Sequence, residues 1–204
     1  RLPAGSGWWA STPAVWNIWV RLSTRMTPVC SSSAAPVASG GQPSGSADGI
    51  VAVHIGSWQS AYADILDPAW LATLSVASRA TGWRKVLADP AARVAVAEQT
   101  GQVTGFVSHG PCREAGAPPS RGEIMALYAA PAVWGQGHGR ALLAHALAQL
   151  QADGFQSVWL WVLAGNQRAI RFYEAAGFQR VAGSETALAL GGRHLRQAAD
   201  QRRR

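Results

Sequence analysis

The stretch PAVWGQGHGRALLAHAL (residues 131–147) packs three glycines into five residues and then continues as an apolar-rich helical pattern. A glycine inside a helix costs about 1 kcal/mol relative to alanine, so Gly135, Gly137 and Gly139 call for another explanation. The first N–H groups of a helix have no partner within it, and the helix dipole adds positive charge there. Because glycine has no Cβ atom, a phosphate can approach these main-chain N–H groups closely, so the stretch predicts a phosphate-binding site.

Two well-known phosphate loops are excluded by spacing. A P-loop ends in Gly-Lys-Ser/Thr, whereas Gly139 is followed by Arg140 and Ala141. A dinucleotide fingerprint needs its third glycine one residue later and an acid about 20 residues beyond, and the run at 157–165 contains no acid. A glycine-rich turn that only connects two elements remains the alternative.

Around this stretch, strand-like and helix-like runs alternate. The expected elements, in chain order, are helices at 49–66, from Pro68 and at 75–89, strands at 93–98, 102–110 and 123–130, a helix to about Ala152, a strand at 157–164, a helix at 166–177 and a strand at 178–190. The two strands before residue 110 form a hairpin with its turn near Thr100 and Gly101. The strand at 157–164 is expected to be buried on both faces. This order predicts an α/β fold with a mixed central sheet flanked by helices.

Composition favours a single domain. The chain has 204 residues, 48% of them hydrophobic, and a net charge of +7 carried almost wholly by arginine. Residues 1–48 are Trp-rich and then Ser/Pro/Gly-rich, and are interpreted as a poorly ordered extension, with a short strand near residues 15–20 as one alternative. The domain is expected at 49–191 and a basic tail at 192–204. Two unmatched cysteines, no export signal and no long apolar run favour a cytoplasmic protein away from membranes.

Two blocks in the second half of the chain resemble one family. WGQGHG (134–139) resembles the Q/R-x-x-G-x-G/A acetyl-coenzyme A signature of the GNAT superfamily of N-acetyltransferases, with Trp134 in place of Gln or Arg. NQRAIRFYEAAGF (166–178) matches the N-x-x-A-x-x-F-Y-x-x-x-G-F block of that family. The resemblance extends over about residues 50–190 and implies a GNAT-like sheet, acetyl-coenzyme A as co-substrate and no metal.

The resemblance also implies roles for residues beside the glycine stretch. Main-chain groups near the end of the central strand would bind the pantetheine arm and polarise the thioester carbonyl. Asn166 and Tyr173 share a helix face, so Asn166 can contact pantetheine while Tyr173 protonates the leaving thiolate. The expected cofactor-binding residues are Leu127, Tyr128, Ala129, Trp134, Gly135, Gln136, Gly137, His138, Gly139, Arg140, Asn166, Ala169 and Phe172.

Attack on the thioester requires an amine that has lost its proton. Glu123 begins the central strand where related sequences carry a water-linked glutamate, so it is the candidate base. An exposed charge at the end of a strand is the alternative. His54 and His109 are weaker candidates, and His138 is expected to face solvent near the phosphate. The expected acceptor-binding residues are Trp58, Gln59, Tyr62 and Trp83, although aromatic residues at helical spacing also occur as ordinary core.

The leading hypothesis is an enzyme that moves an acetyl group from acetyl-coenzyme A to a primary amine by direct attack in a ternary complex. Two alternatives stay open: a non-catalytic acyl-coenzyme A-binding regulator and a basic nucleic-acid-binding module. Arginines are scattered over residues 79–204 without a basic helix, which disfavours the nucleic-acid module. A small-molecule or protein amine is the expected acceptor, and self-association into a homodimer is left open.

Overall fold

The computed structural model describes residues 16–25, 37–38 and 46–189 of the chain. Its elements are β1 (Trp16–Arg25), β2 (Val37–Ala38), α1 (Ser46–Ala61), α2 (Pro68–Ala72), α3 (Val76–Ala88), β3 (Arg93–Gln99), β4 (Gln102–Pro111), β5 (Arg121–Ala129), the short 3-10 helix η1 (Pro131–Val133), α4 (His138–Ala152), β6 (Ser157–Leu163), α5 (Gln167–Ala175), β7 (Gln179–Arg180) and β8 (Thr186–Ala189). None of the helices described is long and apolar enough to cross a bilayer.

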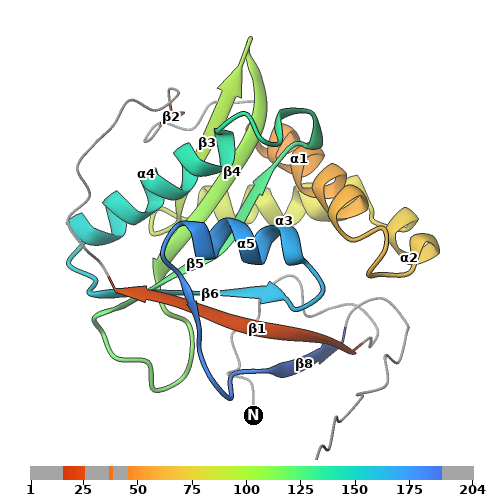
Figure 1. The fold of residues 1–204 in the computed structure, drawn as a ribbon. Coiled ribbons are helices and arrows are strands. Elements are labelled where there is room, and N and C mark those ends of the chain that lie inside the picture. Colours follow the sequence, from red (N-terminus) through yellow and green to blue (C-terminus); the bar gives the residue numbers. More distant parts are fainter. Residues whose placement is uncertain (1–15, 26–36, 39–45, 190–204) are drawn as a thin grey trace, which may run out of the picture.

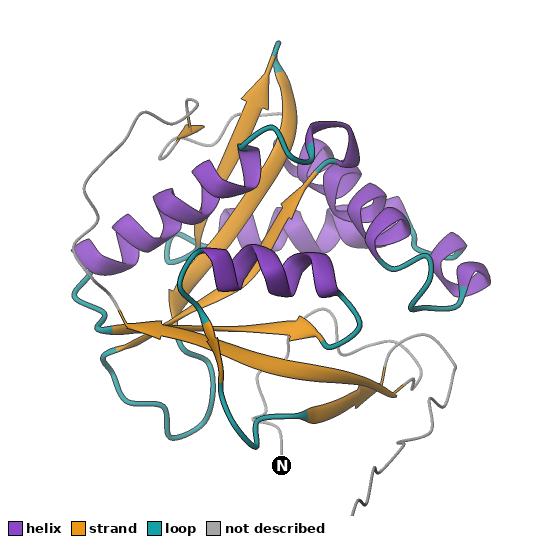
Figure 2. Ribbon diagram, in the orientation of Figure 1, coloured by secondary structure: helices purple, strands orange, loops and turns teal. Residues whose placement is uncertain are grey.

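The described strands form one mixed sheet in the order β2-β3-β4-β5-β6-β1-β7, with β8 beside β1. Strands β3, β4 and β5 are antiparallel neighbours, whereas β5 and β6 run parallel. Helices α4 and α5 lie in front of the sheet in Figure 1, and the fainter α3 lies behind it. Figure 2 shows the helices in purple on the two sides of the orange strands. The predicted mixed α/β fold flanked by helices is confirmed.

Two buried layers hold the helices on the sheet. Leu142 of α4 and Val107 of β4 belong to the cluster on the α4 and α5 side, and neither is exposed. Ile50 of α1, Trp83 of α3 and Phe106 of β4 belong to the cluster on the opposite side. Because Phe106 and Val107 are consecutive in β4, the alternation of a strand sends them to opposite faces.

The hairpin of β3 and β4 is confirmed, and its turn has the geometry that two-residue hairpins favour. Thr100 has φ 51° and Gly101 has φ 76°, both in the left-handed region. A pair of positive φ values matches the right-handed twist of the flanking strands. The turn therefore fixes the register in which Gln99 faces Gln102.

Strands β5 and β6 separate toward their carboxyl ends, and this opening positions the site. Their parallel register joins residues 121–124 to residues 157–160 and then stops, although β5 continues to Ala129 and β6 to Leu163. The two arrows diverge in Figure 2. A bulge adds to the bend, because Ser108 faces Ala126 and His109 faces Ile124, which leaves Met125 as an extra residue in β5.

The N-terminal part of the chain differs from the expectation of an extension outside the domain. Strand β1 pairs with β6 over Trp19–Arg25. The structure therefore has a strand here, as the alternative interpretation of a short strand near residues 15–20 expected. Helix α1 begins at Ser46, before the boundary expected at residue 48. The tail at 192–204 lies outside the described residues.

Two expectations about strands near the C-terminus are wrong. In β6, Val158, Leu160 and Val162 are buried, but Trp159 and Trp161 are only half-buried, so the strand is not buried equally on both faces. The single strand expected at 178–190 is broken into β7 and β8. Gly183 lies between them with φ 68°, a backbone conformation that interrupts an extended strand.

Candidate functional site

The glycine stretch forms a bend between η1 and α4, and two of its glycines are required by the backbone. Gly135 has φ 79° and Gly137 has φ 92°, where a Cβ atom is disfavoured. Gly139 is different, because it lies within α4 without a positive φ, and a Cβ there would sit 3.7 Å from Phe172, an ordinary contact. The bend therefore explains Gly135 and Gly137 but not Gly139.

The N-terminus of α4 has no side-chain cap, unlike those of three other helices. Asp67, Ser75 and Asn166 accept hydrogen bonds from first-turn N–H groups of α2, α3 and α5. Helix α4 has Gly137 at its N-cap position and no such bond. The first backbone hydrogen bond at this end of the helix runs from the N–H of Ala141 to the carbonyl oxygen of Gly137. The N–H groups of the first turn of this 15-residue helix are thus left to an external acceptor.

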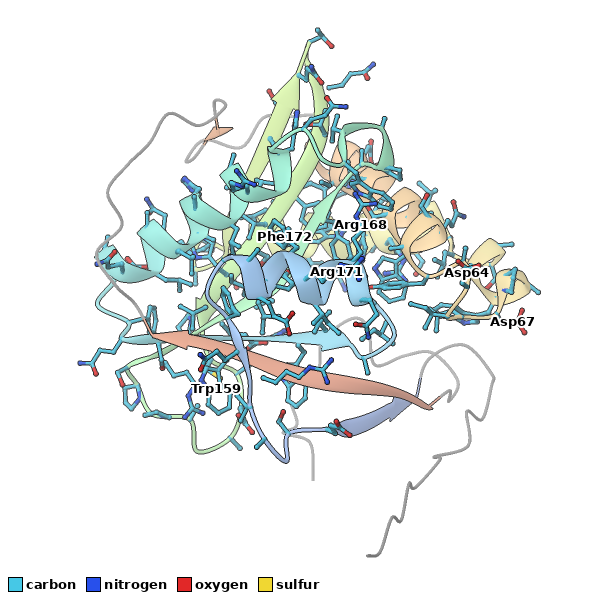
Figure 3. All side chains as sticks on the ribbon, viewed as in Figure 1. Asp64, Asp67, Trp159, Arg168, Arg171 and Phe172 are labelled. Carbon is cyan, nitrogen blue, oxygen red and sulfur yellow. The ribbon has the colours of Figure 1, made fainter. Side chains whose placement is uncertain are left out.

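Trp134 links the bend to the end of β5 and to α5. Its Nε1 donates a hydrogen bond of 2.7 Å to the carbonyl oxygen of Ala129, which also accepts one of 2.9 Å from the Ser57 hydroxyl. The Arg168 guanidinium lies 3.8 Å from the centroid of the Trp134 ring. In Figure 3, Arg168 and Arg171 project from α5, and Phe172 lies between α5 and α4. Trp134 therefore makes contacts of its own where the family signature has Gln or Arg.

His138 does not face solvent, so that expectation is wrong. The side chain is 9% exposed, and its Nδ1 lies 2.9 Å from the hydroxyl of Thr104 in β4. The Thr104 hydroxyl also donates to the carbonyl oxygen of Ala97. His138 therefore anchors the first turn of α4 to the sheet through Nδ1, and its main-chain N–H remains for a ligand.

Three tyrosines from separate elements meet beside the opening between β5 and β6. The hydroxyl of Tyr62, which follows α1, interacts with the side chains of Tyr128 in β5 and of Asn166 at the N-cap of α5, and the Tyr173 hydroxyl in α5 acts on it electrostatically. Burial, followed by the interactions with Tyr128 and Tyr173, raises the pKa of Tyr62 well above 10, although the hydrogen bond with Asn166 acts in the opposite direction, and burial likewise raises the pKa of Tyr128 and Tyr173. Each hydroxyl therefore keeps its proton at neutral pH and can donate it.

An aromatic group surrounds His54 on the α1 and α3 side of the sheet. Its Nδ1 accepts a hydrogen bond of 3.2 Å from Nε1 of Trp83, and its ring stacks on Tyr128 with centroids 4.8 Å apart. Burial, and then the charge of Arg79, lowers the pKa of His54 to about 3. His54 is therefore neutral at physiological pH, because desolvation disfavours the imidazolium.

The four residues expected at the acceptor site lie in different settings. Trp58 and Tyr62 are buried next to each other, with ring centroids 5.3 Å apart. Trp83 is 1% exposed and belongs to the core. Gln59 is exposed on α1. The structure thus brings Trp58 and Tyr62 together with the tyrosine cluster, places Trp83 behind His54, and leaves Gln59 on the surface.

Glu123 is buried near the start of β5, where β5 and β6 are still paired. Its Oε1 accepts 2.6 Å from Nη2 of Arg113, and its Oε2 accepts from the main-chain N–H of Arg113 at 2.9 Å and from Nε at 3.2 Å. Its Cα partner in β6 is Trp159. The carboxylate therefore has a fixed cation partner. Its role as a base stays a prediction.

His109 is buried in β4 and is neutral at physiological pH. Burial, followed by the charge of His145, lowers the pKa of His109 to about 4. Its Nδ1 has no hydrogen-bond partner among the described residues. Three or more potential metal-binding side chains do not gather anywhere in the part of the chain that the structure describes.

Sequence reasoning missed four residues that shape this site. Arg113 holds Glu123, Arg168 covers Trp134, Ser57 holds Ala129, and Arg79 faces Trp58. Arg79 precedes Trp83 by four residues on one helix, so these two side chains share a face, but this spacing does not indicate the contact with Trp58. The other contacts join segments distant in the chain or separated by a loop, and no pattern in the sequence marks them.

Known proteins resemble this chain in sequence and in fold. The model of the acetyltransferase (GNAT) family matches residues 58–178. Uncharacterized N-acetyltransferase YuaI of Bacillus subtilis is 35% identical over 134 residues, which cover 65% of this chain and 75% of that protein. Mycothiol acetyltransferase of Propionibacterium freudenreichii is 34% identical over 93 residues, which cover 46% of this chain but only 29% of that longer protein.

Solved structures agree on the fold. PaiA N-acetyltransferase from Thermoplasma acidophilum, solved in complex with coenzyme A, aligns with a TM-score of 0.59 at 17% sequence identity. The alignment covers 77% of this chain and 99% of that one. At this level of identity the comparison speaks for a shared architecture.

Proposed function

This chain belongs to the acetyltransferase (GNAT) family, and from that premise we propose that it transfers an acetyl group from acetyl-coenzyme A to a primary amine within a ternary complex. The observation that carries the proposal is the uncapped first turn of α4, which follows a bend built on Gly135 and Gly137. It stands at the end of β5, where β6 has turned away.

The cofactor would occupy the opening between β5 and β6. Its pyrophosphate would accept hydrogen bonds from the first-turn N–H groups of α4, where the helix dipole favours an anion. The pantetheine arm would lie along Leu127, Tyr128 and Ala129, whose outer edge is not paired with β6. Gly139 supports this placement, because the backbone conformation does not require a glycine there.

Chemistry would occur beside the tyrosine cluster. The amine nitrogen attacks the thioester carbon, the new C–N bond forms, and the C–S bond breaks with the electron pair leaving on sulfur. Tyr173 would give its proton to that sulfur, which its raised pKa allows because the hydroxyl remains protonated. Asn166 serves two purposes in this arrangement, since its side chain caps α5 and interacts with Tyr62.

The amine must lose a proton to a base or to water before or during attack. Glu123 is the candidate base, acting through water, because its carboxylate is ordered by Arg113 and its Oε1 and Oε2 accept but do not donate. Similarity to mycothiol acetyltransferases over 93 residues favours a small-molecule amine acceptor.

Ligand-dependent thermal stability followed by release of the coenzyme A thiol tests the proposal. Acetyl-coenzyme A should raise Tm, and a panel of primary amines should release free thiol in an enzyme-dependent way. Stabilisation by the cofactor without thiol release would favour a non-catalytic acyl-coenzyme A-binding regulator. Stabilisation by duplex DNA alone would reject the proposal in favour of a nucleic-acid-binding module.

A further inference from the structure

We infer that Arg79 binds an anionic group on the acceptor, so that the acceptor is an amine that also carries a carboxylate or a phosphate. The inference rests on the proposed function and names the substrate class of the same site. It starts from a half-buried cation, which faces the aromatic and hydroxyl groups of the site.

Arg79 belongs to α3 and points toward α1 and β5. Its guanidinium carbon lies 4.8 Å from the centroid of the Trp58 ring. The same charge acts on His54 and on the Tyr128 hydroxyl. Arg79 therefore lies where α1, α3 and the end of β5 meet, on the opposite face of the sheet from α4.

No carboxylate neutralises Arg79 within the described residues. The ion pairs there join Arg84 to Asp48, Arg113 to Glu123 and Arg121 to Glu114. Burial lowers the pKa of Arg79, but an arginine remains a cation at neutral pH. A cation withdrawn from water without a carboxylate partner is costly, so a bound anion would stabilise this arrangement.

A second donor, the Tyr128 hydroxyl, lies beside Arg79. The buried indole N–H of Trp58 and the Tyr62 hydroxyl act on Tyr128 as hydrogen-bond donors, so the Tyr128 oxygen accepts and its own proton remains to be donated. His54 is neutral and brings no competing charge. A guanidinium and a tyrosine hydroxyl therefore lie near each other, and both can donate to the acceptor oxygens of a carboxylate or phosphate.

Tyr128 connects this group to the reaction centre. Its hydroxyl affects the pKa of Tyr62 and of Tyr173, the residue proposed to protonate sulfur. Only the Tyr128 side chain would thus separate an anion held by Arg79 from the residues proposed to act on the thioester sulfur. The amine and the anion of one compact acceptor can therefore occupy the site together, whereas a polyamine would place a second cation beside Arg79.

Three matched pairs of amines test the inference: 4-aminobutanoate with butylamine, L-phenylalanine with 2-phenylethylamine, and O-phosphoethanolamine with ethanolamine. We expect kcat/KM to favour the anionic member of at least one pair by about 10- to 100-fold, the range of a charge-assisted hydrogen bond. The first two pairs report a carboxylate and the third a phosphate. Arg79→Met should remove the preference, and Arg79→Lys should restore part of it, with the Kd for acetyl-coenzyme A unchanged in both.

Arg84→Met is the matched control, because Arg84 shares α3 but forms an exposed ion pair with Asp48. It should change neither the preference nor the Kd. Equal or better use of the neutral amines by the wild-type protein overturns the inference, as does a preference that survives Arg79→Met. The proposed function is judged separately, by acetyl-coenzyme A binding and by turnover of the neutral amines. If the cofactor is neither bound nor consumed, both proposals fail.

Discussion

The Arg168 guanidinium covers the indole ring of Trp134 at 3.8 Å, and the same indole donates a hydrogen bond to the carbonyl oxygen of Ala129. One side chain thus joins α5, the glycine bend and the end of β5. These are the three segments that the proposed function assigns to the cofactor. A change at Trp134 should therefore alter cofactor binding as well as stability.

Trp134→Phe separates the two contacts, because phenylalanine keeps an aromatic face for Arg168 but cannot donate to Ala129. The Ser57 hydroxyl still donates to that carbonyl oxygen. We expect the free energy of unfolding to fall by about 1 kcal/mol, the usual net contribution of one hydrogen bond. We expect the Kd for acetyl-coenzyme A, measured by isothermal titration calorimetry, to rise several-fold. An unchanged Kd would show that this bond does not align the cofactor site.

Alanine at Gly137 and at Gly139 should give opposite effects on stability. Gly137 has φ 92°, so Gly137→Ala should cost about 1–2 kcal/mol in urea unfolding. Gly139 is in ordinary helical conformation with room for a Cβ, so Gly139→Ala should be neutral or stabilise by up to about 1 kcal/mol. If Gly139 serves the cofactor, Gly139→Ala should nevertheless weaken acetyl-coenzyme A binding at least tenfold. Full binding by this stable variant would leave Gly139 unexplained.

Tyr173→Phe tests the proton donor. The ring stays in the core beside Phe178, so the fold and the Kd for acetyl-coenzyme A should be retained. The hydroxyl proton is lost, and kcat should fall by about 10²-fold or more, the usual contribution of a positioned acid. Coenzyme A release under saturating amine measures this effect. Phe178→Leu, which changes the ring packed against Tyr173 but leaves its hydroxyl in place, serves as the packing control. A wild-type kcat in Tyr173→Phe would remove the assigned role.

Glu123 and Arg113 allow the structural and chemical roles of one carboxylate to be separated. Arg113→Met leaves a buried carboxylate without its cation and should destabilise the protein by about 1–3 kcal/mol, a value below that of fully buried pairs because Arg113 is 46% exposed. Glu123→Gln should lower kcat by about 10²-fold if Glu123 is the base. A stable Glu123→Gln variant with unchanged kcat would assign it a structural role.

The sequence predicted those features that depend on local chemistry. Pro131, Asn166 and Gly177 stop or start elements by rules that act within a few residues, and β5, α4 and α5 were found near their observed bounds. The site features that depend on distant contacts were not found. Nothing near Glu123 in the sequence indicates that Arg113 will hold it, and nothing near His138 shows that Thr104 will turn it inward. The prediction that β6 is buried on both faces failed because a continuous apolar run is typical of such a strand. In the structure, Trp159 and Trp161 are half-buried.

Stability should fall in mild acid because of His54. Its pKa is about 3 in the folded protein and near the ordinary value of 6.5 in the unfolded chain. Above pH 6.5 neither state binds this proton, so His54 contributes no pH dependence. Below that pH the unfolded chain takes up the proton first, and the free energy of unfolding drops by about 1.4 kcal/mol per pH unit until the pH approaches 3.

Between pH 6.5 and pH 5 the loss attributable to His54 should be about 2 kcal/mol, and it is measured by urea unfolding at several pH values. His54→Phe removes the proton site but leaves Trp83 Nε1 without its acceptor. This variant should be less stable at pH 7.5 and should lose about 2 kcal/mol less than wild type on acidification. His109→Phe should remove part of the remaining dependence, because the pKa of His109 is lowered to about 4. Identical pH slopes for wild type and His54→Phe would mean that His54 accepts its proton in the folded protein.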